Sequence, residues 1–324
     1  MDRRSFLQTS LSALILSRLG GDRAYGATKT KVAPKPMVTC ENVKAGPDDL
    51  QVRFLGTGSA GWKPGMSTGR RNSSILLDGK VLVDLTVSVL DMLPEGCKPQ
   101  HLVYTHSHHD HYQPLQALKL GVKYVYVSET WVDRAKSDFE TVASAEHLPL
   151  PHFVTIRVGT PFTVEGLTFT PLPANHTTNY YEEQAHIYLI EKGTTPSHLG
   201  VRLLYATDTG GIMGKAARLA GIDSHHSDIA PRPITGFVME STMGLGHDTD
   251  FRIFNHSTPD TVARIATMLT QTHRYTPPTG QPVYLTHISN KLHDGLSQDQ
   301  LNEALPAPLR ASYDGLEVTF RAMP

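Results

Sequence analysis

Short runs of β-branched and aromatic residues recur along the chain from Gln51 onward, and a turn-forming or polar residue closes each run. Runs of about four to eight such residues between turn-forming residues are typical of strands. We therefore predict strands at Gln51–Leu55, Ser74–Leu77, Val81–Asp84, Leu102–Thr105, Tyr124–Val127, Phe153–Val158, Leu167–Pro171, His186–Glu191, Val201–Thr207, Gly236–Glu240, Val283–Thr286 and Leu316–Phe320.

Two other segments space their apolar residues three and four positions apart, as on one face of a helix. This face carries Trp131, Ala135, Phe139 and Val142 in Glu129–Ala145, and Val262, Ile265, Ala266 and Leu269 in Thr258–Thr272. The periodicity by itself indicates a strand-rich α/β or α+β domain and suggests two sheets between helices. Because no repeat or second linker interrupts the pattern, residues 49–324 are interpreted as one domain.

The amino terminus has the three parts of a bacterial export signal. Arg3 and Arg4 precede a short apolar stretch, and the small residues Ala24 and Gly26 mark a cleavage position after residue 26. Because a membrane span needs about 20 apolar residues, we expect no stable membrane anchor, although an amphipathic anchor retained on the mature protein is the alternative. We predict a twin-arginine-type signal peptide over 1–26.

This signal implies passage through the twin-arginine export machinery in the folded state, and a periplasmic or secreted protein. Residues 27–48 are polar and interrupted by Pro34 and Pro36, which predicts a linker between the signal and the domain. Export of a folded chain would suit a protein that acquires a metal before it crosses the membrane.

Composition narrows the class of protein. Hydrophobic residues make up 39% and charged residues 19%, which excludes a disordered chain and a membrane bundle. Residues 1–47 hold eight Lys and Arg against three Asp and Glu (+5), whereas the remainder holds 22 against 28 (−6). An acidic body disfavours long nucleic acids, which are bound through Lys and Arg. Two cysteines cannot supply a disulfide scaffold or a thiolate zinc site, so the 17 histidines are the notable feature.

Four histidines and an aspartate are packed into the segment Thr105–His111, directly after a predicted strand. In an extended segment alternate side chains point the same way, so His106 and His108 can hold one metal while His109 points elsewhere. If a helix begins near Asp110, then Asp110 and His111 turn toward a second metal about 3.5 Å away. The alternative, a solvated surface turn, leaves this density of His and Asp unexplained.

Three further candidates stand where predicted strands end, namely His176, Asp208 and His287. Each one alone is an ordinary turn residue. Layered sheets gather their strand ends at one edge, however, and ligands bind there. Together with the Thr105–His111 segment they supply six metal ligands and one bridging carboxylate.

The pattern His106-x-His108-x-Asp110-His111, followed by His176, Asp208 and His287, resembles the metallo-β-lactamase superfamily. The segment Phe54–Ala60 and the pair Met239–Thr242 and His256–Thr258 resemble its phosphodiesterase branch, which contains ribonuclease Z and the phosphonate-operon cyclic-phosphate phosphodiesterase. The resemblance covers about residues 50–321. It implies a four-layer αββα sandwich of the α+β class, in a single domain.

The resemblance also implies roles for individual residues. The first metal is assigned to His106, His108 and His176, the second to Asp110, His111 and His287, and the bridge to Asp208. His256 matches a proton-donating histidine and Glu240 the acidic residue that supports it, and Asp110 would also orient the attacking hydroxide. The expected cofactors are two divalent ions, zinc first, with manganese and iron as alternatives.

The implied activity is metal-dependent hydrolysis of a small phosphodiester, cyclic forms included. The chain departs from the branch because it lacks the cysteine cluster of the cyclic-phosphate enzyme and a basic tRNA-binding arm, and because it carries an export signal. A lactone or ester hydrolase with the same two metals is the main alternative. An iron redox protein is disfavoured because related flavodiiron proteins have a carboxylate where His108 stands. A non-catalytic periplasmic metal-binding protein is a further alternative. The chain could also form a homodimer.

We predict that changing Arg3 and Arg4 together to Lys leaves folded precursor in the cytoplasm, because the paired arginines are the part of the signal that the export receptor recognises. Fractionation of cells that produce the wild-type and variant chains measures this. Wild-type levels of the variant in the periplasm would contradict the twin-arginine assignment.

Overall fold

The computed structural model describes residues 45–66, 69–223 and 232–324, which form one domain. The predicted signal peptide over 1–26, and the predicted linker up to residue 44, lie outside the described residues. None of the helices that the structure describes combines the length and apolar character needed to span a membrane.

Two seven-stranded sheets form the centre of the domain. The first sheet has the order β14-β1-β2-β3-β4-β5-β6, with β1 Leu50–Gly56, β2 Ser74–Leu77, β3 Val81–Val83, β4 His101–Val103, β5 Tyr124–Ser128, β6 His152–Ile156 and β14 Glu317–Phe320. The second has the order β13-β12-β11-β10-β9-β8-β7, with β7 Phe162–Val164, β8 Leu167–Pro173, β9 His186–Lys192, β10 Val201–Ala206, β11 Gly236–Glu240, β12 Val283–Thr286 and β13 Leu309–Ala311.

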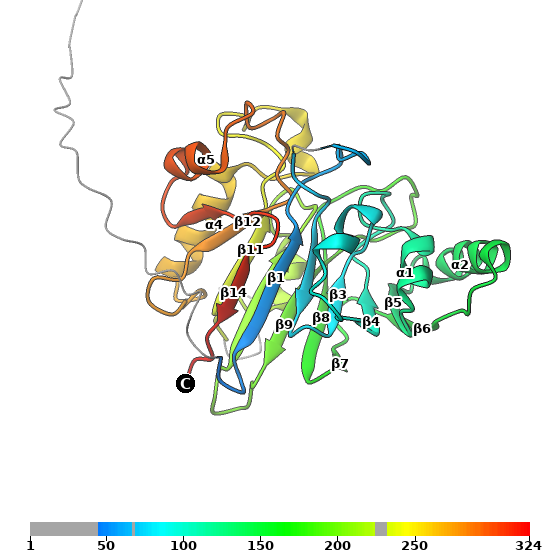
Figure 1. Cartoon of the computed structure of the whole chain (residues 1–324). Helices are drawn as coiled ribbons and strands as arrows, with labels where there is room; N and C mark the ends of the chain where they lie inside the picture. The colour runs from blue at the N-terminus through cyan, green and yellow to red at the C-terminus, as the bar shows by residue number, and fades with distance from the viewer. Residues whose placement is uncertain (1–44, 67–68, 224–231) are drawn as a thin grey trace, which may run out of the picture. The chain divides into compact units, whose positions relative to one another are not determined.

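The helices lie outside the sheets (Figure 1). Their bounds are α1 Pro114–Leu120, α2 Val132–Glu146, α3 Gly214–Leu219, α4 Pro259–Gln271 and α5 Gln298–Ala304, with short 3₁₀ segments η2 Val87–Met92 and η3 Phe251–Phe254. The helices α1 and α2 lie on the side of β4, β5 and β6, whereas α4 and α5 lie beside β11 and β12. The observed architecture is the predicted αββα sandwich.

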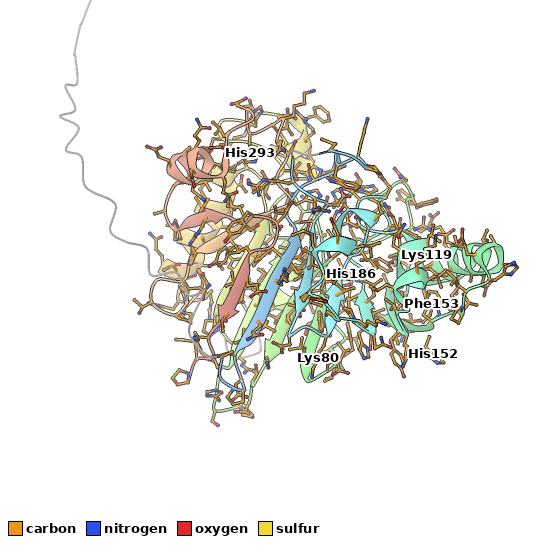
Figure 2. The ribbon with its side chains drawn as sticks, in the orientation of Figure 1. Lys80, Lys119, His152, Phe153, His186 and His293 are labelled. Carbon is orange, nitrogen blue, oxygen red and sulfur yellow. The ribbon has the colours of Figure 1, made fainter. Side chains whose placement is uncertain are left out.

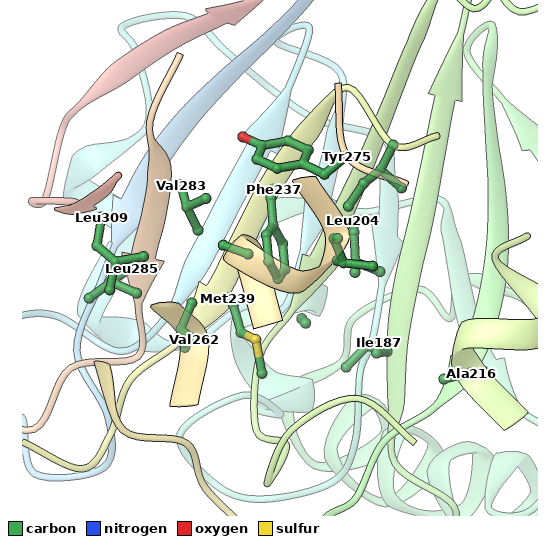
Figure 3. Close-up of a cluster of buried hydrophobic side chains, with 14 of the residues drawn as sticks. Ile187, Leu204, Ala216, Phe237, Met239, Val262, Tyr275, Val283, Leu285 and Leu309 are labelled. Atoms are coloured by element: carbon green, nitrogen blue, oxygen red, sulfur yellow. The ribbon is translucent and has the colours of Figure 1, made fainter. Parts of the chain in front are cut away.

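Three apolar clusters hold these four layers together. The inner faces of the two sheets meet in a cluster that includes Phe54 from the first sheet and Phe169 and Leu203 from the second. A second cluster joins the outer face of the second sheet to α3, α4 and α5, and Figure 3 shows Phe237 and Met239 in this cluster. A third joins the first sheet to α1 and α2. Each sheet therefore buries both of its faces.

Strand direction places the carboxyl ends of several strands at one edge of the sandwich. In the second sheet β10, β11 and β12 are mutually parallel, and β8 runs the same way because β9 is antiparallel to both β8 and β10. In the first sheet β3, β4 and β5 are parallel. The loops that follow β4, β8, β10 and β12 carry the predicted metal ligands, and the contacts among those ligands show that the loops meet at this edge.

All twelve predicted strands are present, with ends shifted by at most a few residues. The sequence patterns missed β7 and β13, which have three residues each and lie at sheet edges, and the short helices α1, α3 and α5. The expectation of a helix beginning near Asp110 is wrong. Residues 109–111 form a turn, and α1 begins only at Pro114, where a proline is well tolerated in the first helical turn.

We predict that Phe237→Ala lowers the free energy of unfolding by about 3–5 kcal/mol, because it leaves a cavity between the second sheet and the helices that cover it. Phe251→Ala is the matched control, because the Phe251 side chain is 77% exposed and should change stability little. Urea unfolding followed by circular dichroism measures both. Equal losses in the two variants would contradict the packing described here.

Candidate metal centre

The predicted ligands converge at the loop edge of the sandwich as two linked groups. The ligand atoms of His106, His108 and His176 lie within 4.8 Å of one another, and so do those of Asp110, His111 and His287. The first group takes two residues from the loop after β4 and one from the loop after β8. The second takes two from the same β4 loop and one from the loop after β12.

The first group consists of three imidazoles with nitrogen atoms facing a common point. His106 Nε2 lies 3.0 Å from His108 Nδ1, and His176 Nε2 lies 3.2 Å from the same atom. Burial lowers the pKa of all three histidines, and repulsion from neighbouring imidazoles adds to this effect. They are therefore neutral near pH 7, which is the form that binds a metal.

The second group mixes imidazoles with a carboxylate. His111 Nε2 and His287 Nε2 are 3.2 Å apart, and Asp110 Oδ2 lies 3.6 and 3.5 Å from them. Burial would lower the pKa of His111, but Asp208, Asp110 and Asp84 outweigh it and raise that pKa well above its ordinary value. The carboxylates that favour a proton on His111 would equally favour a metal cation in its place.

Asp208 joins the two groups. Its Oδ2 lies 3.0 Å from His111 Nε2 and 3.2 Å from His287 Nε2, while its Oδ1 lies 3.7 Å from His176 Nε2. Burial opposes ionisation of this carboxyl, but His287 and His111 hold its pKa well below the ordinary value. One oxygen thus faces each group, as a bridging carboxylate requires.

The hydrogen bonds on the far sides of the rings leave the converging nitrogens available. His111 Nδ1 lies 2.7 Å from Asp84 Oδ2, and His176 Nδ1 lies 3.2 Å from the Asn255 carbonyl, so each Nδ1 donates. His287 Nδ1 lies 2.7 Å from Thr242 Oγ1. The inward Nε2 atoms then carry lone pairs, which is the arrangement that partners of metal-binding histidines enforce. The donor set therefore fits two divalent cations.

Three residues of the centre have strained backbones. Asp84, Asp208 and His287 have φ values of 60°, 48° and 52°, in the left-handed region that residues other than glycine rarely occupy. Each stands within two residues of the end of a buried strand, and the unusual turn directs its side chain toward the centre. Strain of this kind is held in place by surrounding structure and is common at functional sites.

The predicted pair of His256 and Glu240 also forms beside the two groups. His256 Nδ1 lies 3.1 Å from Glu240 Oε1, and that oxygen also accepts hydrogen bonds from the backbone N–H groups of Thr209 and Ser257. Burial would lower the pKa of His256, but Glu240 outweighs it and raises the pKa to about 9. The His256 side chain is 19% exposed, more than any ligand of the second group, so it can meet a bound molecule.

Sequence patterns missed the residues that hold the ligands from behind. Asp84 is fully buried and also accepts two hydrogen bonds from Thr105, at 2.8 Å each. Thr242 donates to Glu240 Oε2 at 2.6 Å while it contacts His287. The only available signal for Asp84 was a polar residue that closes an apolar strand, whereas its partner His111 lies 27 residues away.

Other histidines lie apart from these groups. His109 is exposed, as predicted for the one side chain of the motif that points elsewhere. His186, at the start of β9, and His293, before α5, are buried in different parts of the domain (Figure 2). His293 Nε2 contacts the Ser241 carbonyl at 2.7 Å. Neither belongs to a metal-binding group among the residues that the structure describes.

The chain therefore combines an αββα sandwich with a cluster of His and Asp residues at its loop edge that could hold metal ions, as in metal-dependent hydrolases. The chain belongs to the beta-lactamase superfamily, because the model of the beta-lactamase superfamily domain matches residues 90–288. This confirms the family that the sequence motifs resemble, and it supports the prediction of a metal-dependent hydrolase. No curated protein matches the chain in sequence.

Solved structures share the fold at low sequence identity. A diphosphatase from the PhnP family is 23% identical with a TM-score of 0.58, over 85% of this chain and 99% of that one. Zn²⁺-bound PqqB from Methylobacterium extorquens is 17% identical with a TM-score of 0.57, over 83% and 99%. A long form of RNase Z from yeast is 14% identical with a TM-score of 0.52, over 86% and 42%.

We predict that the purified protein, saturated with zinc, binds two ions per chain and that Asp208→Ala loses most activity and binds fewer ions. His109→Ala is the matched control, because this exposed histidine stands in the same motif but outside both groups. Elemental analysis after gel filtration gives the stoichiometry. A wild-type chain that binds at most one ion would exclude the two-metal centre.

Proposed function

We propose that the chain is a dinuclear metal-dependent hydrolase that acts on a small phosphodiester, cyclic forms included, after export to the periplasm. The observation that carries this proposal is the Asp208 carboxylate, which faces two complete ligand groups at once. Zinc is the expected metal, because imidazole and carboxylate ligands suit it.

Two divalent ions in these groups would supply a hydroxide nucleophile near neutral pH and neutralise the charge of a phosphodiester. The chain's own residues set the geometry for this chemistry. Burial opposes ionisation of Asp110, but His111 and His287 hold its pKa well below the ordinary value, so this carboxylate is ionised at neutral pH. In that state Asp110 can accept a hydrogen bond and orient the attacking group.

His256 is suited to protonate the leaving group. Its Nδ1 donates to Glu240, so the opposite nitrogen, Nε2, can carry the second proton of the imidazolium. The raised pKa of about 9 keeps the ring protonated near pH 7, as a general acid requires. Glu240 is itself fixed by the backbone and hydroxyl of Thr242, at 2.7 and 2.6 Å. This pair favours a substrate whose leaving group is poor.

A cavity lined in part by the loop that carries His287 is consistent with a small substrate. This cavity of about 190 Å³ is lined by Ile288 and Ser289, which directly follow His287 in the chain. Trp62 and Met66 form an apolar part of its lining, and Lys291 adds a positive charge. Such a cavity suits the non-reacting part of a small diester, whereas the acidic body disfavours a long nucleic acid.

One structural neighbour adds support for phosphate chemistry, because it is named a diphosphatase. This neighbour favours a phosphodiester over the alternative substrate class, a lactone or ester. The His256–Glu240 pair supports the phosphodiester, because it matches the histidine and acidic residue that the phosphodiesterase branch carries.

We predict that His256→Ala lowers kcat for an alkyl phosphodiester by about 10²–10⁴-fold, the range expected for loss of a general acid. The loss should be much smaller for a bis(nitrophenyl) phosphate, because that leaving group needs little protonation. Steady-state assays with both substrates, with metal content measured in parallel, test this. Equal losses would remove His256 as the acid, and rapid lactone turnover without diesterase activity would favour the alternative.

A further inference from the structure

We propose that Glu183 is a positioning residue that fixes the geometry of the first metal-binding group. The proposal rests on the ligand assignment of the proposed function but not on its substrate. Glu183 lies in the connection between β8 and β9, seven positions after the ligand His176, and its side chain is fully buried. It acts on the ligands through Ser107.

Ser107 stands between two ligands of the first group, His106 and His108. Glu183 accepts hydrogen bonds from both polar groups of this residue. The Ser107 backbone N–H donates to Glu183 Oε1 at 2.7 Å, and its hydroxyl donates to Oε2 at 2.6 Å. The peptide between the two histidines is therefore fixed in both position and rotation, and this rotation sets where the two rings point.

Arg134, from α2, completes the arrangement. Its Nη2 donates to Ser107 Oγ at 2.9 Å and forms a short contact with Glu183 Oε2. The guanidinium lies 3.4 Å from the centre of the Tyr180 ring and 5.5 Å from that of Trp131. These aromatic rings restrict its motion, and the guanidinium pairs with the buried Glu183 carboxylate, both of whose oxygens accept hydrogen bonds from Ser107.

This arrangement spans the two sheets. His106 and His108 follow β4 of the first sheet, whereas His176 follows β8 of the second. Ser107 and Glu183 join the same two loops, so their hydrogen bonds set the separation of the ligands across the sheets. His111 and His287 of the second group are instead held by Asp84 and Thr242, which contact the Nδ1 atoms of these two rings. Loss of Glu183 should therefore affect the first group selectively.

Glu183→Gln tests this with little change in shape. Glutamine keeps an oxygen for the Ser107 N–H, but its amide NH₂ would face two donors, the Ser107 hydroxyl and Arg134. We expect the affinity of the first site for Co²⁺ to fall about 10–100-fold, as for other partners that orient metal ligands, while the second site keeps its affinity. Competition with a chelator measures both affinities, and the visible spectrum of bound Co²⁺ reports the ligand geometry. His176→Ala identifies which affinity belongs to the first site.

Glu191→Gln is the matched control. Glu191 lies near the end of β9, the strand that follows Glu183, and pairs with Arg202 at 2.9 Å in an ion pair that is also largely buried. The control makes the same chemical change and removes a comparable contact. We expect it to lower the melting temperature to a similar degree and to leave both Co²⁺ affinities and the spectrum unchanged.

Unchanged first-site affinity in Glu183→Gln, or an equal loss in Glu191→Gln, would overturn the proposal. The proposed function fails in different ways. A wild-type chain that binds only one ion would exclude the dinuclear centre. In that case the role of Glu183 is tested by the affinity for the single ion whose binding His176→Ala abolishes. Absence of diesterase activity would exclude the substrate class without altering the Co²⁺ result. A wild-type chain that binds no ion would overturn both proposals.

Discussion

The whole centre depends on one buried carboxylate, that of Asp208, which is kept ionised by the imidazoles around it. Burying a charge in a protein interior is strongly unfavourable unless opposite charge or hydrogen bonds compensate. His287 and His111 provide this compensation from the loops after β12 and β4, and their own positions are fixed by Thr242 and Asp84. The loops of both sheets must therefore meet at one edge for the charge to be tolerated, so folding and site formation are one process.

Local patterns were sufficient for most of the fold. Strands such as β11 and β12 have boundaries that coincide with the apolar runs, because every residue in them is buried and a polar residue stands only at the last position. Edge strands such as β7 and β13 have three residues, too few for a pattern to emerge. The helices α1, α3 and α5 have six or seven residues, so packing rather than periodicity determines them.

The convergence of the candidate ligands could be predicted because their spacing within Thr105–His111 and their places at strand ends are local features. The residues that hold these side chains in place could not be predicted from the sequence. Ser107 and Glu183 are 76 residues apart, and Thr242 and His287 are 45 apart. Such pairs are defined only by the packing of the two sheets, and serine, threonine and glutamate are common enough that no local pattern distinguishes the ones that support a ligand.

The attachment of the ligands to loops that directly follow buried strands has a consequence for how such a protein can change. Its candidate metal-binding atoms are positioned by the sheets, whereas the exposed aromatic residues Tyr181, Phe251 and Phe254 stand on connecting segments that lead into or away from the centre. Substitutions of these exposed side chains can alter which molecules reach the centre without moving the ligands. The fold thus separates the chemistry it performs from the selection of its substrate, and it allows new specificities to evolve on an unchanged reactive core.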